Sequence, residues 1–345
     1  MSKNNGRREL VVVGGSAGAL EALNELLSRL PQDFSAPILL VLHIPNEYPS
    51  HLEEILGRAG PLPVKEVRRD ERLQPGTVYV APPDHHLLVE DSRAEVSKGP
   101  RENRHRPAID PLFRTAARAY GPRTIGVILS GTLDDGSSGL MAVKMVGGLT
   151  VVQARHEAMN PEMPMRAKHY ADAENELPVA EIAELLIAET EKGPTAREAR
   201  KGEGAMSKEM KREALKAHLK TDANAEKRGE PSAFACPECG GVLWELQEGQ
   251  LLRFRCRVGH AYTVDSLRTA MTESVEQALW ASMRALEEKA ALLRRVADRT
   301  LPKLSDEYRQ EAGGCDRHVE TIRRMLAANQ KMDDQEEEAR GAGSR

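Results

Sequence analysis

The chain has 345 residues, of which 40% are hydrophobic and 30% charged, so it can bury one core of ordinary size and a smaller second unit. Its 49 Lys and Arg against 53 Asp and Glu give a formal net charge of -4, and no positive excess points to nucleic acid as a partner. The first apolar run, residues 10–13, is too short for a signal sequence or a membrane span, which predicts a cytoplasmic protein without membrane insertion.

Residues 9–191 alternate short runs rich in Val, Ile and Leu with amphipathic helical runs. The runs that read as strands are residues 9–13, 38–43, 77–81, 124–130 and 149–153. The helical patterns are residues 19–30, 50–58, 111–120, 137–146 and 179–191. Residues 86–97 read as a hairpin, and Asp110 before Pro111 is typical of an N-cap. Strands that alternate with helices predict a Rossmann-like, doubly wound α/β fold with a mostly parallel sheet.

Composition divides the rest of the chain into further segments. The predicted domains are a catalytic domain over residues 1–192, a charged linker over 193–232, a zinc ribbon over 233–263, a helical region over 264–332 and a disordered tail over 333–345. Within the helical region, a long helix over residues 264–297 keeps an apolar stripe, and a second helix over 305–328 is expected to fold back on it as a helical hairpin.

A glycine-rich turn at residues 14–18, Gly-Gly-Ser-Ala-Gly, follows the first strand and precedes a helix. A dinucleotide-binding loop is disfavoured, because Ser16 occupies the third position of that pattern and the second strand ends in His43 instead of an acidic residue. A serine that only caps the helix stays open as an alternative. The turn also fits G-x-S-x-G, in which small flanking residues expose a nucleophilic hydroxyl.

Two further side chains are expected at the edge of the sheet where Ser16 lies. His43 ends the second strand, and Asp134 and Asp135 follow the strand at residues 124–130. The carboxyl ends of neighbouring parallel strands open onto one edge, so a serine, a histidine and an aspartate can meet there. Either aspartate could instead cap the next helix. The order Ser, His, Asp excludes an ordinary α/β-hydrolase, whose order is Ser, Asp, His.

Together these stretches resemble the catalytic domain of CheB-type chemotaxis methylesterases, which hydrolyse γ-glutamyl methyl esters on chemoreceptors. The similarity extends over residues 10–186. The matching motifs are the nucleophile turn at residues 14–18, His-x-Pro at 43–45, Tyr-Val-Ala-Pro at 79–82, Asn-Arg-His-Arg-Pro at 103–107, the Gly-x-x-x-Asp-Gly turn within 130–136 and Met-Pro at 163–164. The resemblance implies that Ser16 is the nucleophile, His43 the base and Asp135, directly before glycine, the orienting acid, with no cofactor for catalysis.

Two features depart from the family. The turn continues Ser-Ala-Gly-Ala where the family usually has Ser-Thr-Gly-Gly, and most CheB enzymes begin with a receiver domain, whereas the similar stretch here starts at Leu10. We expect a serine hydrolase that demethylates a chemoreceptor or a related signalling protein, with glutamine deamidation by the same acyl-enzyme route. The alternative is a non-catalytic regulatory scaffold of a signalling system.

The C-terminal half carries a second constellation of reactive side chains. Cys236 and Cys239 form a C-x2-C knuckle, and Cys256 and His260 form a C-x3-H pair, which together supply the full ligand set of a structural zinc site. Cys315 is expected to be packed rather than a ligand. We expect the helices to mediate protein binding or self-association, and unfolding of the ribbon, as a separate module, is expected to leave hydrolysis intact.

Overall fold

The computed structural model describes residues 8–43, 50–192 and 229–342, with side chains as far as residue 328. It divides into two compact units, Met1–Leu267 and Arg268–Arg345. Most of the expected linker, residues 193–228, lies outside the described residues.

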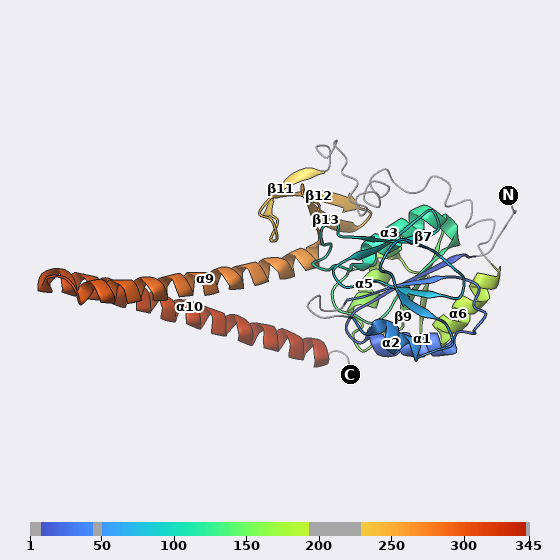
Figure 1. Ribbon diagram of the computed structural model, residues 1–345, viewed down its shortest axis with the longest axis horizontal. Helices are drawn as coiled ribbons and strands as arrows, with labels where there is room; N and C mark the ends of the chain where they lie inside the picture. Colours follow the sequence, from blue (N-terminus) through green and yellow to red (C-terminus); the bar gives the residue numbers. More distant parts are fainter. Residues whose placement is uncertain (1–7, 44–49, 193–228, 343–345) are drawn as a thin grey trace. The chain divides into compact units, whose positions relative to one another are not determined.

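A seven-stranded parallel sheet forms the centre of the first unit (Figure 1). Its order is β10-β9-β8-β1-β2-β5-β3, and every neighbouring pair is parallel. The strands are β1 Leu10–Gly15, β2 Ile38–Leu42, β3 Val64–Glu66, β5 Val78–Val80, β8 Thr124–Ile128, β9 Leu149–Gln153 and β10 Asn175–Leu177. The strand order reverses at β1, so the sheet has its topological switch point between β1 and β8.

Helices cover both faces of this sheet and enclose two cores. On one face α1 Ala19–Arg29, α2 Leu52–Gly57 and α6 Val179–Lys192 pack on alternate residues of the strands. On the other face lie α3 Ile109–Tyr120, α4 Ser137–Met145 and α5 Glu162–Ala171 (Figure 1). The doubly wound α/β fold predicted from the alternation of strands and helices is confirmed.

A small antiparallel sheet accompanies the main one. It consists of β4 Glu71–Arg72, β6 His86–Glu90 and β7 Arg93–Ser97, and β6 with β7 forms the predicted hairpin. A 3-10 turn, η1, covers Gly121–Arg123. The sequence pattern did not single out β3, β4, β10 or α5, because these strands have only two or three residues and α5 begins with a Met-Pro turn.

The cysteine-rich segment forms a four-stranded antiparallel sheet within the first unit. Its strands, in sheet order, are β11 Glu230–Ala235, β12 Val242–Glu248, β13 Leu251–Cys256 and β14 Ala261–Thr263. Leu251 at the start of β13 belongs to the core cluster that α3 and α4 form on the parallel sheet. The ribbon therefore shares a hydrophobic core with the parallel sheet and its helices.

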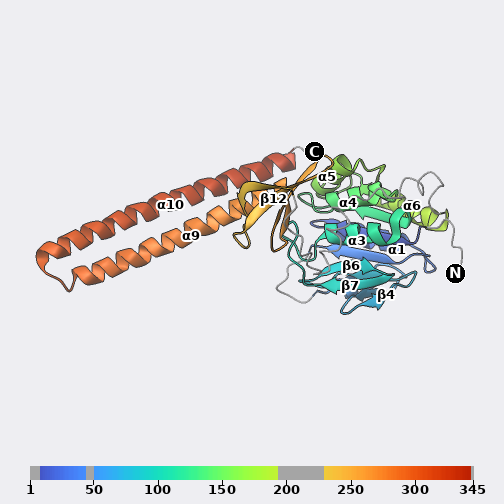
Figure 2. The same cartoon turned by 90° about the horizontal axis from the view of Figure 1, so that it is seen from above.

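Two long helices follow the ribbon: α9 Val264–Ala297 and α10 Pro302–Ala342. Figure 2 shows them running side by side, and the antiparallel hairpin is held by ion pairs such as Lys289–Glu311 at 2.8 Å. Cys315 packs with Ala290 and Ala312 between them. The sequence pattern ended the second helix near residue 328, whereas α10 continues to Ala342. No helix in the described ranges is long and apolar enough to cross a membrane.

The N-cap predicted for α3 is wrong. The helix begins at Ile109, and its N-cap, Ala108, makes no side-chain capping bond. The N–H groups of Ile109 and Asp110 donate instead to the carboxylate of Asp135. Asp110 Oδ1 instead accepts hydrogen bonds from the N–H groups of Gly136 and Gly139, at 3.1 and 2.6 Å, at the start of α4. Asp110 therefore binds the N-terminus of α4 instead of capping its own helix, because the N–H groups of a free helix N-terminus need acceptors.

Candidate functional site

Three of the predicted site residues follow strands that are neighbours in the sheet. Strand β1 lies between β8 and β2, and its register pairs Gly15 with Leu42 of β2. Ser16 comes directly after β1, His43 directly after β2, and Asp135 in the loop after β8. This is the carboxyl edge at the switch point, where open α/β sheets bind ligands.

The turn that carries Ser16 is held by backbone hydrogen bonds on both sides. Ser16 N donates to Ser130 O at 2.9 Å, and His43 N donates to Gly15 O at 3.2 Å. Gly18 is the N-cap of α1 with φ of 75°, a left-handed conformation that favours glycine. Gly131 passes so close that a Cβ there would lie 3.0 Å from Ser16 Cβ. Small residues thus let two turns converge on the half-buried serine.

His43 and Asp135 are in direct contact. His43 Nε2 lies 2.8 Å from Asp135 Oδ2, and both side chains are almost fully buried. The carboxylate also accepts hydrogen bonds from Asn103 Nδ2 and from the N–H groups of Ile109, Asp110 and Gly136. Burial alone would raise the pKa of Asp135, but the hydrogen bond and charge of His43 and the Ile109 N–H hold it well below its usual range. Asp135 is therefore an ionised partner for the imidazole.

Asn103 and Asp110 are site residues that the sequence alone did not identify. Asn103 Nδ2 donates to Asp135 Oδ1 at 2.8 Å and to Asp110 Oδ2 at 2.9 Å. Burial and the nearby Asp135 charge raise the pKa of Asp110 to about 7, so Asp110 binds a proton before Asp135 does as the pH falls. The only signal in the sequence was the position of Asn103 in the Asn-Arg-His-Arg-Pro motif.

His105 packs against the imidazole of His43. The two rings stack with centroids 3.7 Å apart and an interplanar angle of 11°. Burial, together with the charge of His43, lowers the pKa of His105 to about 3. His105 is therefore neutral near pH 7 and supports the position of His43 without adding a second positive charge.

Hydrogen bonds of Ser130 hold the Ser16 turn in place. Ser130 Oγ donates to Ala17 O at 2.7 Å and accepts from Asn160 N at 2.9 Å. Ser130 N donates in turn to Gln153 Oε1 at 2.9 Å. These contacts tie the Ser16 turn to β8 and β9, and their residue types showed no pattern in the sequence.

The four predicted metal ligands also meet. Cys236, Cys239, Cys256 and His260 offer ligand atoms that all lie within 4.8 Å of one another. The Sγ atoms of Cys239 and Cys256 lie 3.7 Å apart, and His260 Nδ1 lies 3.5 and 3.6 Å from the sulfurs of Cys256 and Cys236. A zinc tetrahedron has S–S edges of about 3.8 Å and S–N edges of about 3.5 Å. The cluster can hold one metal ion.

Side chains around the cluster fit a metal site as well. Glu238 Oε2 lies 3.3 Å from His260 Nε2, the ring nitrogen opposite the ligand atom. A carboxylate on that nitrogen fixes the tautomer that leaves Nδ1 free to bind a metal. Tyr262 Oη donates to Glu238 Oε1 at 3.1 Å and lies 3.6 Å from Cys236 Sγ.

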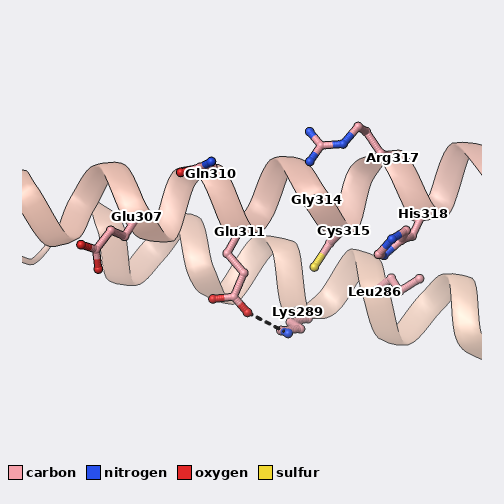
Figure 3. Close-up of a pocket in the computed structure, with 9 residues that line it drawn as sticks. All are labelled: Leu286, Lys289, Glu307, Gln310, Glu311, Gly314, Cys315, Arg317 and His318. Atoms are coloured by element: carbon pink, nitrogen blue, oxygen red, sulfur yellow. Dashed lines mark ion pairs between the residues drawn. The ribbon is translucent and has the colours of Figure 1, made fainter.

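A separate pocket lies in the helical hairpin (Figure 3). It is lined by Leu286, Lys289, Glu307, Gln310, Glu311, Gly314, Cys315, Arg317 and His318. Figure 3 shows the Lys289–Glu311 ion pair crossing from one helix to the other. The pocket contains none of the predicted catalytic or metal-binding residues.

Comparisons with known proteins give one consistent result. The CheB methylesterase family model matches residues 11–186, about half of the chain. A Leptospira interrogans protein named for protein-glutamate methylesterase and protein-glutamine glutaminase activities is 41% identical over 180 residues, which cover 52% of this chain and 93% of that protein. Protein-glutamate methylesterase/protein-glutamine glutaminase 1 of Anaeromyxobacter dehalogenans is 39% identical over 186 residues, 53% of each chain.

The solved structures agree with the sequence comparisons. The crystal structure of the Thermotoga maritima CheB methylesterase catalytic domain matches with a TM-score of 0.50 and 34% identity, covering 52% of this chain and 97% of that one. The ribbon and the two long helices lie outside the region that the family model matches. On the family match and these relatives, the chain belongs to the CheB methylesterase family.

Proposed function

We propose that this protein hydrolyses γ-glutamyl methyl esters on a chemoreceptor or a related signalling protein, with Ser16, His43 and Asp135 as its catalytic triad. The observation that carries the proposal is the 2.8 Å contact between His43 Nε2 and Asp135 Oδ2, formed beside strand β1, which ends directly before Ser16. The family match supports the reaction class, and the names of the relatives support the substrate class.

In the first half of the reaction, Ser16 Oγ attacks the ester carbonyl and forms a tetrahedral intermediate. Because Asp135 occupies Nε2 of His43, the opposite nitrogen, Nδ1, takes the serine proton. Asp135 stabilises the imidazolium and keeps the productive tautomer. The carbon–oxygen bond to the methoxy group then breaks, and His43 returns the proton to the leaving methanol.

In the second half, water attacks the acyl-enzyme. His43 removes a proton from the water, the ester bond to Ser16 breaks, and the serine recovers its proton as the substrate protein leaves with a free glutamate side-chain carboxylate. We assign the Thr132 N–H and the N–H groups of the turn after His43 as hydrogen-bond donors to the oxyanion of the tetrahedral intermediate. Most of that turn lies outside the described residues. Each such donor is worth about 3 kcal/mol.

The same route accommodates a glutamine side chain. Ammonia replaces methanol as the leaving group, and the acyl-enzyme and its hydrolysis are unchanged. Relatives that are 35–41% identical carry names with both activities, which favours glutaminase as a second reaction of the same site.

Two further points are proposals. The helices α9 and α10 bind a partner protein or associate with a second copy of the chain, which the exposed side chains of Trp280, Leu292 and Leu301 support. The protein is located in the cytoplasm.

A fluorophosphonate probe tests the proposal against the scaffold alternative. Wild-type protein is expected to be labelled at Ser16, because an activated hydroxyl attacks the phosphorus, and His43→Ala should reduce the labelling rate at least about a hundredfold. Mass spectrometry of the labelled peptide locates the adduct. Absence of labelling in folded wild-type protein would favour the scaffold.

We further propose that Cys236, Cys239, Cys256 and His260 bind one structural zinc ion. Four protein ligands fill a tetrahedral shell and leave no position for a reactive water. The ion would join the knuckle between β11 and β12 to the turn between β13 and β14, a link that this small sheet needs because it buries few apolar side chains of its own.

Metal analysis checks the zinc proposal. Protein purified without chelator is expected to contain one zinc per chain, and Cys236→Ser is expected to contain less than about a tenth of that, because three ligands hold the ion poorly. The buried Cys315, which lies outside the cluster, provides the matched control, and Cys315→Ser should keep its zinc. Zinc-free wild-type protein would contradict the assignment.

A further inference from the structure

We propose that the Cys/His ribbon is part of the active site, because residues at its end hold the side chain that orients the catalytic carboxylate. Thr263 and Ser266 act as positioning residues for Asn103 and the Asp134–Asp135 turn. This inference rests on the proposed role of Asp135 as the orienting acid.

Asn103 links the ribbon to Asp135. Its Oδ1 accepts hydrogen bonds from Thr263 N at 3.2 Å and Ser266 Oγ at 3.4 Å, while its Nδ2 donates to Asp135. Its backbone N–H donates to Ala261 O of β14 at 2.8 Å. Donors from the end of the ribbon and from the first turn of α9 thus face the amide oxygen, which forces the amide NH2 toward the carboxylate. The side chain is 1% exposed, so water cannot replace these partners.

Thr263 reaches the catalytic loop directly as well. Its Oγ1 donates to Asp134 Oδ1 at 2.7 Å and accepts from Ser266 N at 3.2 Å, while Ser266 Oγ accepts from Thr263 N at 2.9 Å. The last two bonds form a reciprocal cap at the start of α9. The same hydroxyl therefore ends the ribbon, begins the helix and anchors the residue next to Asp135.

Buried charges fix the ribbon in this position. Arg253 of β13 contacts Glu102, the neighbour of Asn103, at 3.1 Å and Glu248 of β12 at 3.1 Å. Glu248 Oε2 in turn accepts from Ser138 Oγ of α4 at 2.6 Å, and Arg114 of α3 contacts Glu102 at 2.5 Å. Separating such pairs would leave desolvated charges without partners, which is strongly unfavourable. The ribbon is held in one register on the segment that carries Asn103.

These contacts change what is expected of the ribbon. As a separate module it was expected to unfold without affecting hydrolysis, whereas its contacts now predict that the catalytic rate depends on it. Thr263 and Ser266 lie outside residues 11–186, which the family model matches. In this chain, a segment beyond the family domain therefore supports its active site.

The test uses the full chain and a small ester, p-nitrophenyl acetate. Thr263→Val keeps the shape of the side chain and removes only the hydroxyl, and we expect kcat to fall about tenfold with KM unchanged, because a small displacement of the triad slows the chemistry and not substrate binding. Thr263→Ser restores the hydroxyl and should lie within about twofold of wild type. Thr272→Val is the matched control, since Thr272 is exposed and bonds to Arg268 O of its own helix.

The outcomes separate this inference from the proposed function. If wild-type protein does not react with a fluorophosphonate at Ser16, the proposed function fails and this inference fails with it. If wild type reacts and Thr263→Val keeps the wild-type kcat, the inference alone is overturned. Thermal unfolding checks that each variant is folded. If Thr263→Val is unfolded at the assay temperature, Ser266→Ala replaces it, because this variant removes the contact to Asn103 Oδ1. An unchanged kcat in Ser266→Ala would equally overturn the inference.

Discussion

Ser16→Ala is expected to lower ester hydrolysis by about a thousandfold or more, because no other group can form the acyl-enzyme. The residue is half-buried in a surface turn and loses a single oxygen, so the free energy of unfolding should change by less than about 0.5 kcal/mol. Release of p-nitrophenol from the small ester measures the rate, and denaturant unfolding measures the stability.

Ser130→Ala is the matched control for this variant. Its hydroxyl reaches the Ser16 turn from the end of β8 and donates to Ala17 O at 2.7 Å, so its loss removes a support and not a nucleophile. We expect at most about a tenfold loss of rate and a destabilisation of about 1 kcal/mol. Near-normal activity in Ser16→Ala, or a greater loss in Ser130→Ala, would contradict the assignment of the nucleophile.

Asp135→Asn is expected to lower the rate on the order of a thousandfold or more. Both carboxylate oxygens of Asp135 accept hydrogen bonds from N–H donors, which come from Asn103 Nδ2 and from the backbone. An asparagine in its place would turn its NH2 group toward some of these donors in either orientation of the amide. The variant also loses the ionised group that keeps His43 in the productive tautomer. Stopped assays at several enzyme concentrations can measure the residual rate.

Asp172→Asn serves as the control for the removal of a carboxylate. The Asp172 side chain is 97% exposed at the end of α5, so its replacement should leave the rate unchanged. If Asp135→Asn keeps more than about a tenth of the wild-type rate, Asp135 does not orient the imidazole. A tenfold loss in Asp172→Asn would indicate a general effect of charge on the assay.

Much of the fold could be predicted because the information is local. The runs of Val, Ile and Leu identified β1, β2, β8 and β9 to within a few residues, and the apolar stripe identified α9 with the bounds Val264–Ala297. The metal cluster was also predictable, since the residues of the two ligand pairs are three and four positions apart and tight turns bring such pairs together. Short edge strands such as β3 and β10 carry too few residues for a period to be recognised.

The choice between two adjacent aspartates illustrates what a local pattern cannot decide. Asp134 and Asp135 are chemically equal in the sequence, and only the family resemblance favoured the second. In the structure Asp135 contacts His43, whereas Asp134 accepts a hydrogen bond from Thr263, 129 residues further along the chain. Asp135 reaches only the N–H of Gly136, the N-cap of α4, whereas the N–H of Gly139 inside the helix donates to Asp110 from α3.

The sequence by itself determined the alternation of strands and helices, the positions of Ser16 and His43 at the ends of adjacent strands, and the ligands of the metal cluster. Each depends on spacing within a few residues of chain. The tertiary structure alone decided the surroundings of Asp135 and the docking of the ribbon, since Asn103 contacts Thr263 across 160 residues and Glu102 contacts Arg253 across 151 residues. Contacts between buried polar groups that far apart leave no periodic pattern in a sequence, because their energies depend on which partners the fold brings together.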